Sequence, residues 1–252
     1  MTDATVQETV LAPGLLRWTL AHPRKRNALT PGMLAWLARR VDELAGEVVL
    51  ITGEGDSFCA GFDLDALPDV LADDTPDDPL LRMTSKLRRA DATFIAVLHG
   101  HVYGAGVELA CSCDLRIARD DTRFTIPAAR LGIVYHAEGV ALIHHVLGHA
   151  VTQRLLLLGE TVPADELLRA GGVHAVHGAS DLFEAAAAAA TRLRAGAPAS
   201  LRAHRDRLRG LIAGAAPDPA YDSARRAAFA SDDHREGRSA ARERRPPRFT
   251  GR

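Results

Sequence analysis

The most regular pattern along the chain is an alternation of short apolar runs with longer amphipathic stretches. Runs of branched and apolar residues at 14–20, 47–53 and 94–100 predict buried strands. Further strands are expected in DLRIARD at 114–120 and in GGVHAVHG at 171–178. Helical periodicity fills most of the segments between them, so the pattern predicts an α/β fold.

The last quarter of the chain departs from this alternation. From residue 181 onward the composition is helical and no strand is predicted. We therefore expect an α/β core over residues 1–195 and a helical C-terminal region over residues 196–252. The basic tail, RERRPPRFTGR, leaves two interpretations open: a solvated arm, or a segment packed on a partner subunit.

Composition excludes several classes of protein. The 252 residues are 47% hydrophobic and carry a net charge of -1, and the basic residues are dispersed without interleaved aromatics, which argues against a nucleic-acid partner. No apolar run approaches the roughly 20 residues that span a bilayer, so no membrane partner is expected. The N-terminus lacks the pattern of a signal peptide, which predicts a cytoplasmic protein.

Cysteine and histidine spacing gives no sign of a metal site. The chain has three cysteines, Cys59, Cys111 and Cys113, and the Cys-Ser-Cys motif has no second pair to complete a zinc site. No HExxH motif is present. We interpret the cysteines as small buried side chains and expect no metal.

The first candidate for chemistry is HGHVYGAGVELACSCDLRIA, residues 99–118. It follows a predicted strand, turns through Gly-Ala-Gly and enters a helix. The first N–H groups of a helix have no partner within it, and the helix dipole adds positive charge there, so they can stabilise an oxyanion. Glu108 shares a helix face with Ala105, and a carboxylate beside a polarised carbonyl can move a proton.

The second candidate, DSFCAGFDLDAL at residues 56–67, follows another predicted strand in the same way. Gly61 permits close approach of the backbone to a ligand. The N–H of Phe62 could then converge with that of Ala105. Two main-chain donors from two strand-following turns predict an oxyanion hole.

Four segments together resemble the signature segments of the crotonase superfamily, the enoyl-CoA hydratase/isomerase family. They are HPRKRNALT, LITGEGDSFCAGFDLDAL, HGHVYGAGVELACSCDLRIA and FTIPAARLGIVYHAEGVALIHHVLG. The resemblance implies a spiral of ββα units with a helical C-terminal trimerisation region, and a homotrimer or a dimer of trimers. It also implies an acyl-CoA thioester as ligand, with coenzyme A as part of the substrate and no separate cofactor.

The resemblance also implies roles for individual residues. The thioester carbonyl would lie between the N–H groups of Phe62 and Ala105, and Glu108 matches the first of the two catalytic glutamates of the hydratases. Cations of HPRKRNAL would reach the phosphates of coenzyme A, or would be plain surface charge. The other implied contacts with coenzyme A or substrate are Arg24, Lys25, Arg26, Ala28, Ala60, Gly61, Asp63 and Leu64.

The sequence departs from the hydratase pattern at one position. The second hydratase glutamate falls on Ala128, which would lie at the substrate and whose methyl group cannot transfer a proton. Two nearby residues could replace it: Glu138, expected near the start of a following helix, and His136, two residues earlier. We favour Glu138, because an acid at a helix start can point into the pocket while its backbone stays fixed.

Three functions remain open. Hydration of a 2-enoyl-CoA is the leading hypothesis, because Glu108 occupies the hydratase position. Double-bond isomerisation of an enoyl-CoA is the runner-up. A non-catalytic acyl-CoA-binding protein is the alternative from a different class, and Ala128 is the residue that favours it.

Overall fold

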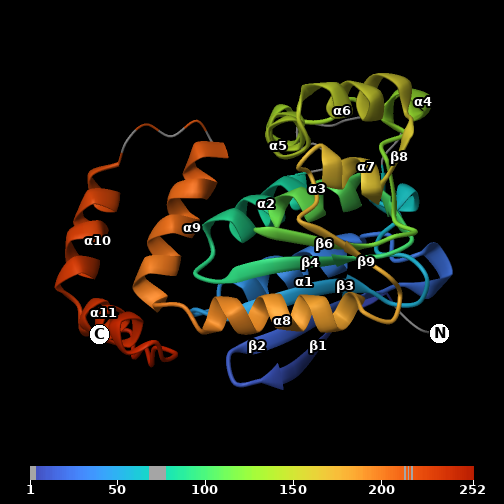
Figure 1. Ribbon diagram of the computed structural model, residues 1–252. Helices are drawn as coiled ribbons and strands as arrows, with labels where there is room; N and C mark the ends of the chain where they lie inside the picture. Colours follow the sequence, from blue (N-terminus) through green and yellow to red (C-terminus); the bar gives the residue numbers. More distant parts are fainter. Residues whose placement is uncertain (1–3, 68–77, 213, 215, 217) are drawn as a thin grey trace. The chain divides into compact units, whose positions relative to one another are not determined.

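The computed structural model describes residues 4–67, 78–212, 214, 216 and 218–252, and these form two compact units (Figure 1). The first unit spans residues 1–186 and the second spans residues 187–252. The boundary lies within helix α8 (Leu182–Arg194), whereas the sequence places it just after this helix, between residues 195 and 196.

The first unit is built on a six-stranded sheet with the order β1-β2-β3-β4-β6-β9. All neighbouring strands are parallel except the antiparallel pair β1–β2. Every residue of β3 is buried, as its unbroken apolar run predicts for a central parallel strand. The strands are β1 (Thr5–Ala12), β2 (Leu15–Ala21), β3 (Val48–Gly53), β4 (Thr93–Leu98), β6 (Leu115–Arg119) and β9 (Ala175–His177).

A second, three-stranded sheet has the order β5 (His101–Tyr103), β7 (Arg123–Thr125) and β8 (Thr161–Pro163). The chain passes from the large sheet to the small one after β4 and again after β6. A single bridge between Cys59 and Val102 continues this pattern after β3. Successive turns of the chain thus contribute to both sheets, which confirms the mixed α/β fold that the sequence predicts.

Helices surround these sheets, and the predicted start of α1 is confirmed. Thr30 caps it by accepting the Met33 N–H at 3.3 Å, with Pro31 in the first turn. Helix α3 is buried along its whole length and packs against α2 and α5 (Figure 1). The helices of this unit are α1 (Pro31–Val41), α2 (Asp78–Arg89), α3 (Ala105–Ser112), α4 (Ala128–Leu131), α5 (Ala137–Leu147), α6 (His149–Gln153) and α7 (Ala164–Arg169), with short helical turns at Pro23–Lys25, Leu64–Ala66 and Arg154–Leu158.

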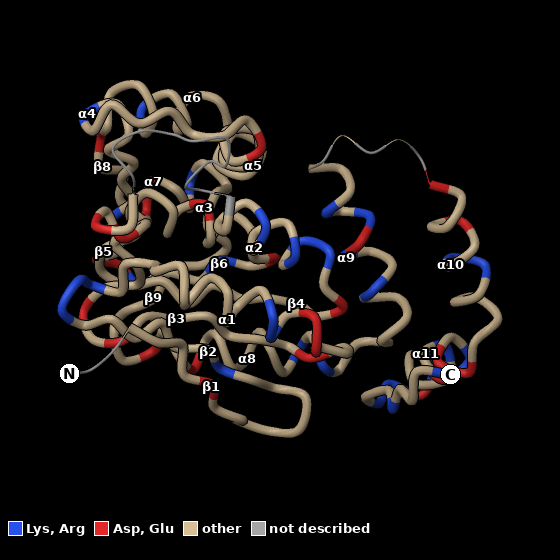
Figure 2. Tube along the Cα trace, turned by 180° about the vertical axis from the view of Figure 1, so that it is seen from behind, with Lys and Arg blue, Asp and Glu red and all other residues tan. Residues whose placement is uncertain are grey.

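The second unit is helical, as predicted. It contains α9 (Pro198–Ile212), α10 (Pro219–Ala230) and α11 (Asp232–Glu243). Basic and acidic residues occur along both α9 and α10 (Figure 2). Across the described part of the chain, no helix combines the length and the apolar character needed to cross a membrane.

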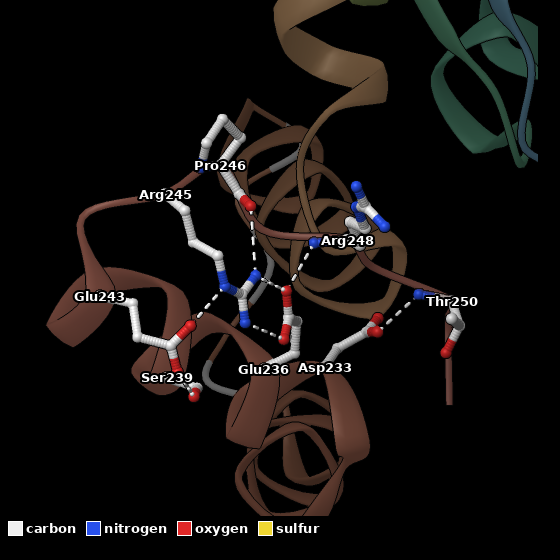
Figure 3. A network of polar contacts seen from close by, with 8 residues as sticks. All are labelled: Asp233, Glu236, Ser239, Glu243, Arg245, Pro246, Arg248 and Thr250. Carbon is white, nitrogen blue, oxygen red and sulfur yellow. Dashed lines mark hydrogen bonds and ion pairs between the residues drawn. The ribbon is translucent and has the colours of Figure 1, made fainter.

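The C-terminal tail is bound to its own helix α11 (Figure 3). Asp233 accepts the Thr250 N–H at 2.7 Å, and Glu236 accepts the Arg248 N–H at 2.8 Å. Hydrogen bonds from Arg245 and then from the Arg248 N–H lower the pKa of the Glu236 carboxyl to about 2. The tail is therefore ordered against its own helix, with most of its residues exposed, and packing on a partner subunit stays a prediction.

Candidate active site

A cavity of about 340 Å³ lies in the first unit, where the turns after β3, β5 and β7 meet the start of α5. Its wall combines main-chain atoms of two glycine-containing turns with a few polar side chains and an apolar surface. The sequence-predicted residues that line it are Ala60, Gly61, Phe62, Leu64, Ala105, Glu108, Ala128 and His136.

The segment that precedes α1 is fixed to one edge of this cavity by Asn27. Arg26 and Asn27 both have left-handed backbone conformations, with φ of 48° and 60°. The buried Asn27 amide donates to the carbonyl oxygens of Glu54 and Ser57, each at 2.8 Å. The Ala60 N–H in turn donates to the Arg26 carbonyl at 2.9 Å. The amide thus ties this segment to the turn that carries Phe62.

The two turns that face the cavity approach each other closely. Gly61 has φ of 98° and Gly104 has φ of 52°, which side chains rarely adopt. A Cβ on Gly61 would lie 3.0 Å from the main-chain carbonyl oxygen of Tyr103 and 3.4 Å from the main-chain nitrogen of Ala105. Within the described residues, neither the Phe62 N–H nor the Ala105 N–H donates to an acceptor. Two main-chain donors are therefore available at the cavity wall.

Glu108 lies one turn into α3 and is completely buried. The Thr84 hydroxyl donates to its Oε1 at 3.2 Å, but the same hydroxyl lies 3.3 Å from the Leu81 carbonyl, so one hydrogen serves two acceptors. Oε2 accepts no hydrogen bond from the described residues. Burial lowers the pKa of the nearby Arg88 guanidinium, and the Glu108 carboxylate opposes this shift. A buried carboxylate with an open acceptor is a candidate for chemistry.

His136 lies directly against this carboxylate. Its Nδ1 accepts the Gly139 N–H at 3.0 Å and thereby caps α5. Its Nε2 is 3.2 Å from Glu108 Oε1, and 13% of its side chain is exposed. The ring therefore connects the start of α5 to the buried acid.

Comparison with known proteins decides the family. The model of the enoyl-CoA hydratase/isomerase family matches residues 12–252. The chain belongs to this family. It is 30% identical over 247 residues to the 2,3-dehydroadipyl-CoA hydratase of Escherichia coli (strain K12), covering 94% of this chain and 96% of that protein. It is 31% identical over 252 residues to the probable enoyl-CoA hydratase echA6 of Mycobacterium leprae (strain TN), covering 95% and 97%.

Solved structures agree with this assignment to the enoyl-CoA hydratase/isomerase family. An enoyl-CoA hydratase/carnithine racemase from Magnetospirillum magneticum superposes with a TM-score of 0.89 at 27% identity. The match covers 100% of this chain and 97% of that one. This superposition establishes the crotonase-like fold for this chain. The family as a whole acts on acyl-CoA thioesters.

The structure also locates Ala128, the position at which the sequence departs from the hydratase pattern, and the two residues that could replace the glutamate there. Ala128 is the first residue of α4 and lines the cavity. Glu138 is 62% exposed at its side chain, with Oε2 3.6 Å from His136 Nδ1, and is absent from the cavity lining in the described part of the chain. Of the two candidates to replace the missing glutamate, the structure brings His136 to Glu108 and leaves Glu138 at the surface.

The other predicted contacts with coenzyme A lie outside the described cavity lining. These are Arg24, Lys25, Arg26, Ala28 and Asp63. Lys25 forms ion pairs with Asp63 at 2.6 Å and with Asp65 at 2.5 Å, and hydrogen bonds to these two carboxylates raise its pKa. Arg24 and Arg26 are exposed. The acidic partners of Lys25 reduce the positive charge that it offers to a phosphate.

Several residues of the site were not identified from the sequence. Thr84 reaches Glu108 from α2, and nothing in its local sequence marks it. The apolar wall includes Leu67, Leu80, Leu131 and Ile133, whose shared location depends on the fold.

The remaining predictions for this region concern cysteine and metal. All three cysteines are free and buried, and burial raises the pKa of the Cys59 and Cys111 thiols to about 12, which makes them poor nucleophiles. Among the described residues, no three His, Cys, Asp or Glu side chains gather as a metal site would require.

Proposed function

We propose that this protein is a hydratase-like enzyme that acts on an acyl-CoA thioester through an enolate held by the Phe62 and Ala105 N–H groups. The observation that carries this proposal is the location of Glu108 on the same cavity as the two available main-chain donors. The names of the hydratase relatives support the reaction class.

Hydration of a 2-enoyl-CoA needs only one carboxylate if that group both receives and returns the proton. Glu108 accepts a proton from water as the water oxygen bonds to the β-carbon, and the π electrons move to the thioester oxygen. The resulting enolate is stabilised between the two N–H groups. Glu108 then gives the proton to the α-carbon, which yields the 3-hydroxyacyl-CoA.

Double-bond isomerisation is the second candidate, because it needs only one carboxylate. A single carboxylate can remove a proton from the α-carbon of a 3-enoyl-CoA and deliver it to the γ-carbon, which yields the conjugated 2-enoyl-CoA without a bound water. The same two N–H groups would stabilise the intermediate dienolate. The methyl group of Ala128 leaves Glu108 as the one cavity-lining carboxylate in the described part of the chain.

Three assays of the purified protein separate these functions. Crotonyl-CoA hydration is followed by loss of the conjugated thioester absorbance, and 3-enoyl-CoA isomerisation by its gain. Exchange of the α-proton with solvent deuterium reports enolate formation alone. Hydration supports the leading proposal, and isomerisation without hydration supports the second. Tight acyl-CoA binding with no reaction and no exchange would contradict both and identify a non-catalytic binding protein.

The Ala128→Glu variant tests whether the rest of a two-carboxylate site is intact. We expect crotonyl-CoA hydration to rise by about tenfold or more, because a positioned general acid or base typically contributes 10²–10⁴-fold. An acid in the first turn of α4 also suits the helix dipole. Ala129→Glu is the matched control, because Ala129 is exposed on the same helix. Equal rates in the two variants would contradict this expectation.

The wall of the cavity favours an uncharged acyl group. Its described lining contains no Lys or Arg, and its wall includes Leu80, Leu131 and Ile133. A terminal carboxylate placed there would be buried with no Lys or Arg in the described lining to pair with it, which is costly. We therefore expect kcat/KM for crotonyl-CoA to exceed that for 2,3-dehydroadipyl-CoA by about tenfold or more. Competing both thioesters in one reaction gives this ratio directly, and a ratio near one would show that a carboxylate is accommodated.

We further propose a homotrimer or a dimer of trimers formed through the second unit, and a cytoplasmic enzyme without a separate cofactor. These proposals follow from the family resemblance. Mass measurement by light scattering distinguishes monomer, trimer and hexamer.

A further inference from the structure

His136 has two different partners, one for each ring nitrogen. Nδ1 accepts the Gly139 N–H at 3.0 Å, and Nε2 lies 3.2 Å from Glu108 Oε1. A neutral imidazole has one donor and one acceptor nitrogen. Because Nδ1 accepts from the backbone, the proton of the neutral ring is on Nε2, on the side of the carboxylate.

Glu108 therefore has two polar neighbours at the same oxygen. The Thr84 hydroxyl donates to Oε1 from α2, but it shares its hydrogen with the Leu81 carbonyl. His136 approaches Oε1 from the start of α5. The hydrogen bond at Oε1 is the one from Thr84, the His136 ring lies against the same oxygen at 3.2 Å without hydrogen-bond alignment, and Oε2 accepts no hydrogen bond from the described residues.

We propose that His136 is a positioning residue that orients Glu108, so that Oε2 is the oxygen that exchanges a proton with water or with the acyl chain. This inference rests on the proposed function. It also assigns a role at this site to His136 in place of the sequence-favoured Glu138, whose side chain is 62% exposed.

Gly139 makes this arrangement possible. A Cβ at this position would lie 2.8 Å from Glu108 Oε2 and 3.0 Å from His136 Nε2. Real Cβ atoms essentially never lie closer than 3.0 Å to another heavy atom, so the first distance is too short and the second is at the limit. Any larger residue at position 139 must therefore displace the acid or the ring. The absence of a side chain at residue 139 thus allows His136 and Glu108 to meet.

The decisive experiment separates capping of α5 from positioning of Glu108. Asparagine is a good N-cap, but it is too short to reach Glu108 from residue 136. In His136→Asn we expect kcat to fall by about 10- to 100-fold, as for a misplacement of about 1 Å, with KM and melting temperature nearly unchanged. In His136→Ala we expect the same loss of kcat and a melting temperature lower by about 2–4 °C.

A second pair of variants perturbs the contact without changing either partner. Gly139→Ala should lower kcat by a similar factor, because the new methyl group would displace Glu108 or His136. Gly32→Ala is the matched control, because Gly32 is also helical and a Cβ there would meet only Thr30 Oγ1, at 3.8 Å. We expect the control to retain wild-type kcat.

The outcomes distinguish this inference from the proposed function. Wild-type kcat in His136→Asn would overturn the positioning role and leave the proposed function intact. If the wild-type protein neither turns over nor exchanges any enoyl-CoA, the proposed function fails, and ¹⁵N NMR of labelled histidine then tests the contact. A neutral His136 ring protonated at Nε2, with a resonance that moves in Glu108→Gln, supports the contact. A ring protonated at Nδ1 overturns it.

Discussion

Replacing Glu108 with glutamine should lower kcat for hydration or isomerisation by about 10²–10⁴-fold, the usual contribution of a positioned general acid or base. Glutamine keeps the shape of the side chain and can still fill the site between Thr84 and His136. It cannot accept a proton at the reacting oxygen. The measurements are kcat in the same thioester assay and the rate of α-proton exchange, and both should fall together.

The control for Glu108→Gln is the same substitution at a glutamate that does not line the cavity. Glu184 is exposed in the first turn of α8, and Glu184→Gln should retain wild-type kcat. Acyl-CoA binding by Glu108→Gln should change little, because the two main-chain donors remain. A fall in kcat of less than about threefold would show that Glu108 is a structural residue.

Replacing Ala105 with proline should lower kcat by about 10²–10³-fold, the typical cost of removing one oxyanion donor. Ala105 is the first residue of α3, a position where proline is well tolerated because its missing N–H has no partner within the helix. The change therefore removes the donor with little effect on the helix itself. The measurements are kcat and the rate of α-proton exchange.

Folding of the Ala105→Pro variant must be checked by circular dichroism and thermal unfolding, because the proline ring would lie close to Gly61. A Cβ on Gly61 would be only 3.4 Å from the Ala105 nitrogen, so the two turns have little spare room. A variant that folds normally and retains more than about a third of the wild-type rate would exclude the Ala105 N–H as an oxyanion donor.

Local sequence predicted the parts of the fold that depend on local chemistry. The apolar runs predicted strands β3 and β4, and the Thr30-Pro31 pair predicted the start of α1. Strand β1 was not predicted, because it is an edge strand with mostly exposed residues and its pairing with β2 depends on the rest of the sheet.

The candidate site shows a similar division. The turn at Gly104 and the acid one turn later are adjacent in sequence, so their relation could be read directly. The contact of Thr84 with Glu108 joins α2 to α3, and its geometry comes only from packing. The position of Glu138 followed from sequence, but its direction depends on the rotation of α5, which turns His136 toward Glu108 and Glu138 outward.

The two available N–H groups belong to the main chain, and this has a consequence for how such a protein can evolve. Most substitutions at Phe62 or Ala105 leave an N–H in place, with proline as the exception. In the proposed mechanism, the direction of proton transfer depends instead on which residues stand at position 128 on α4, at position 136 in the cap of α5 and at position 139 on α5. If the proposed function holds, mutations there would change where a proton is delivered while the main-chain stabilisation of the enolate persists. A library randomised at these three positions would therefore sample new reactions on one conserved intermediate.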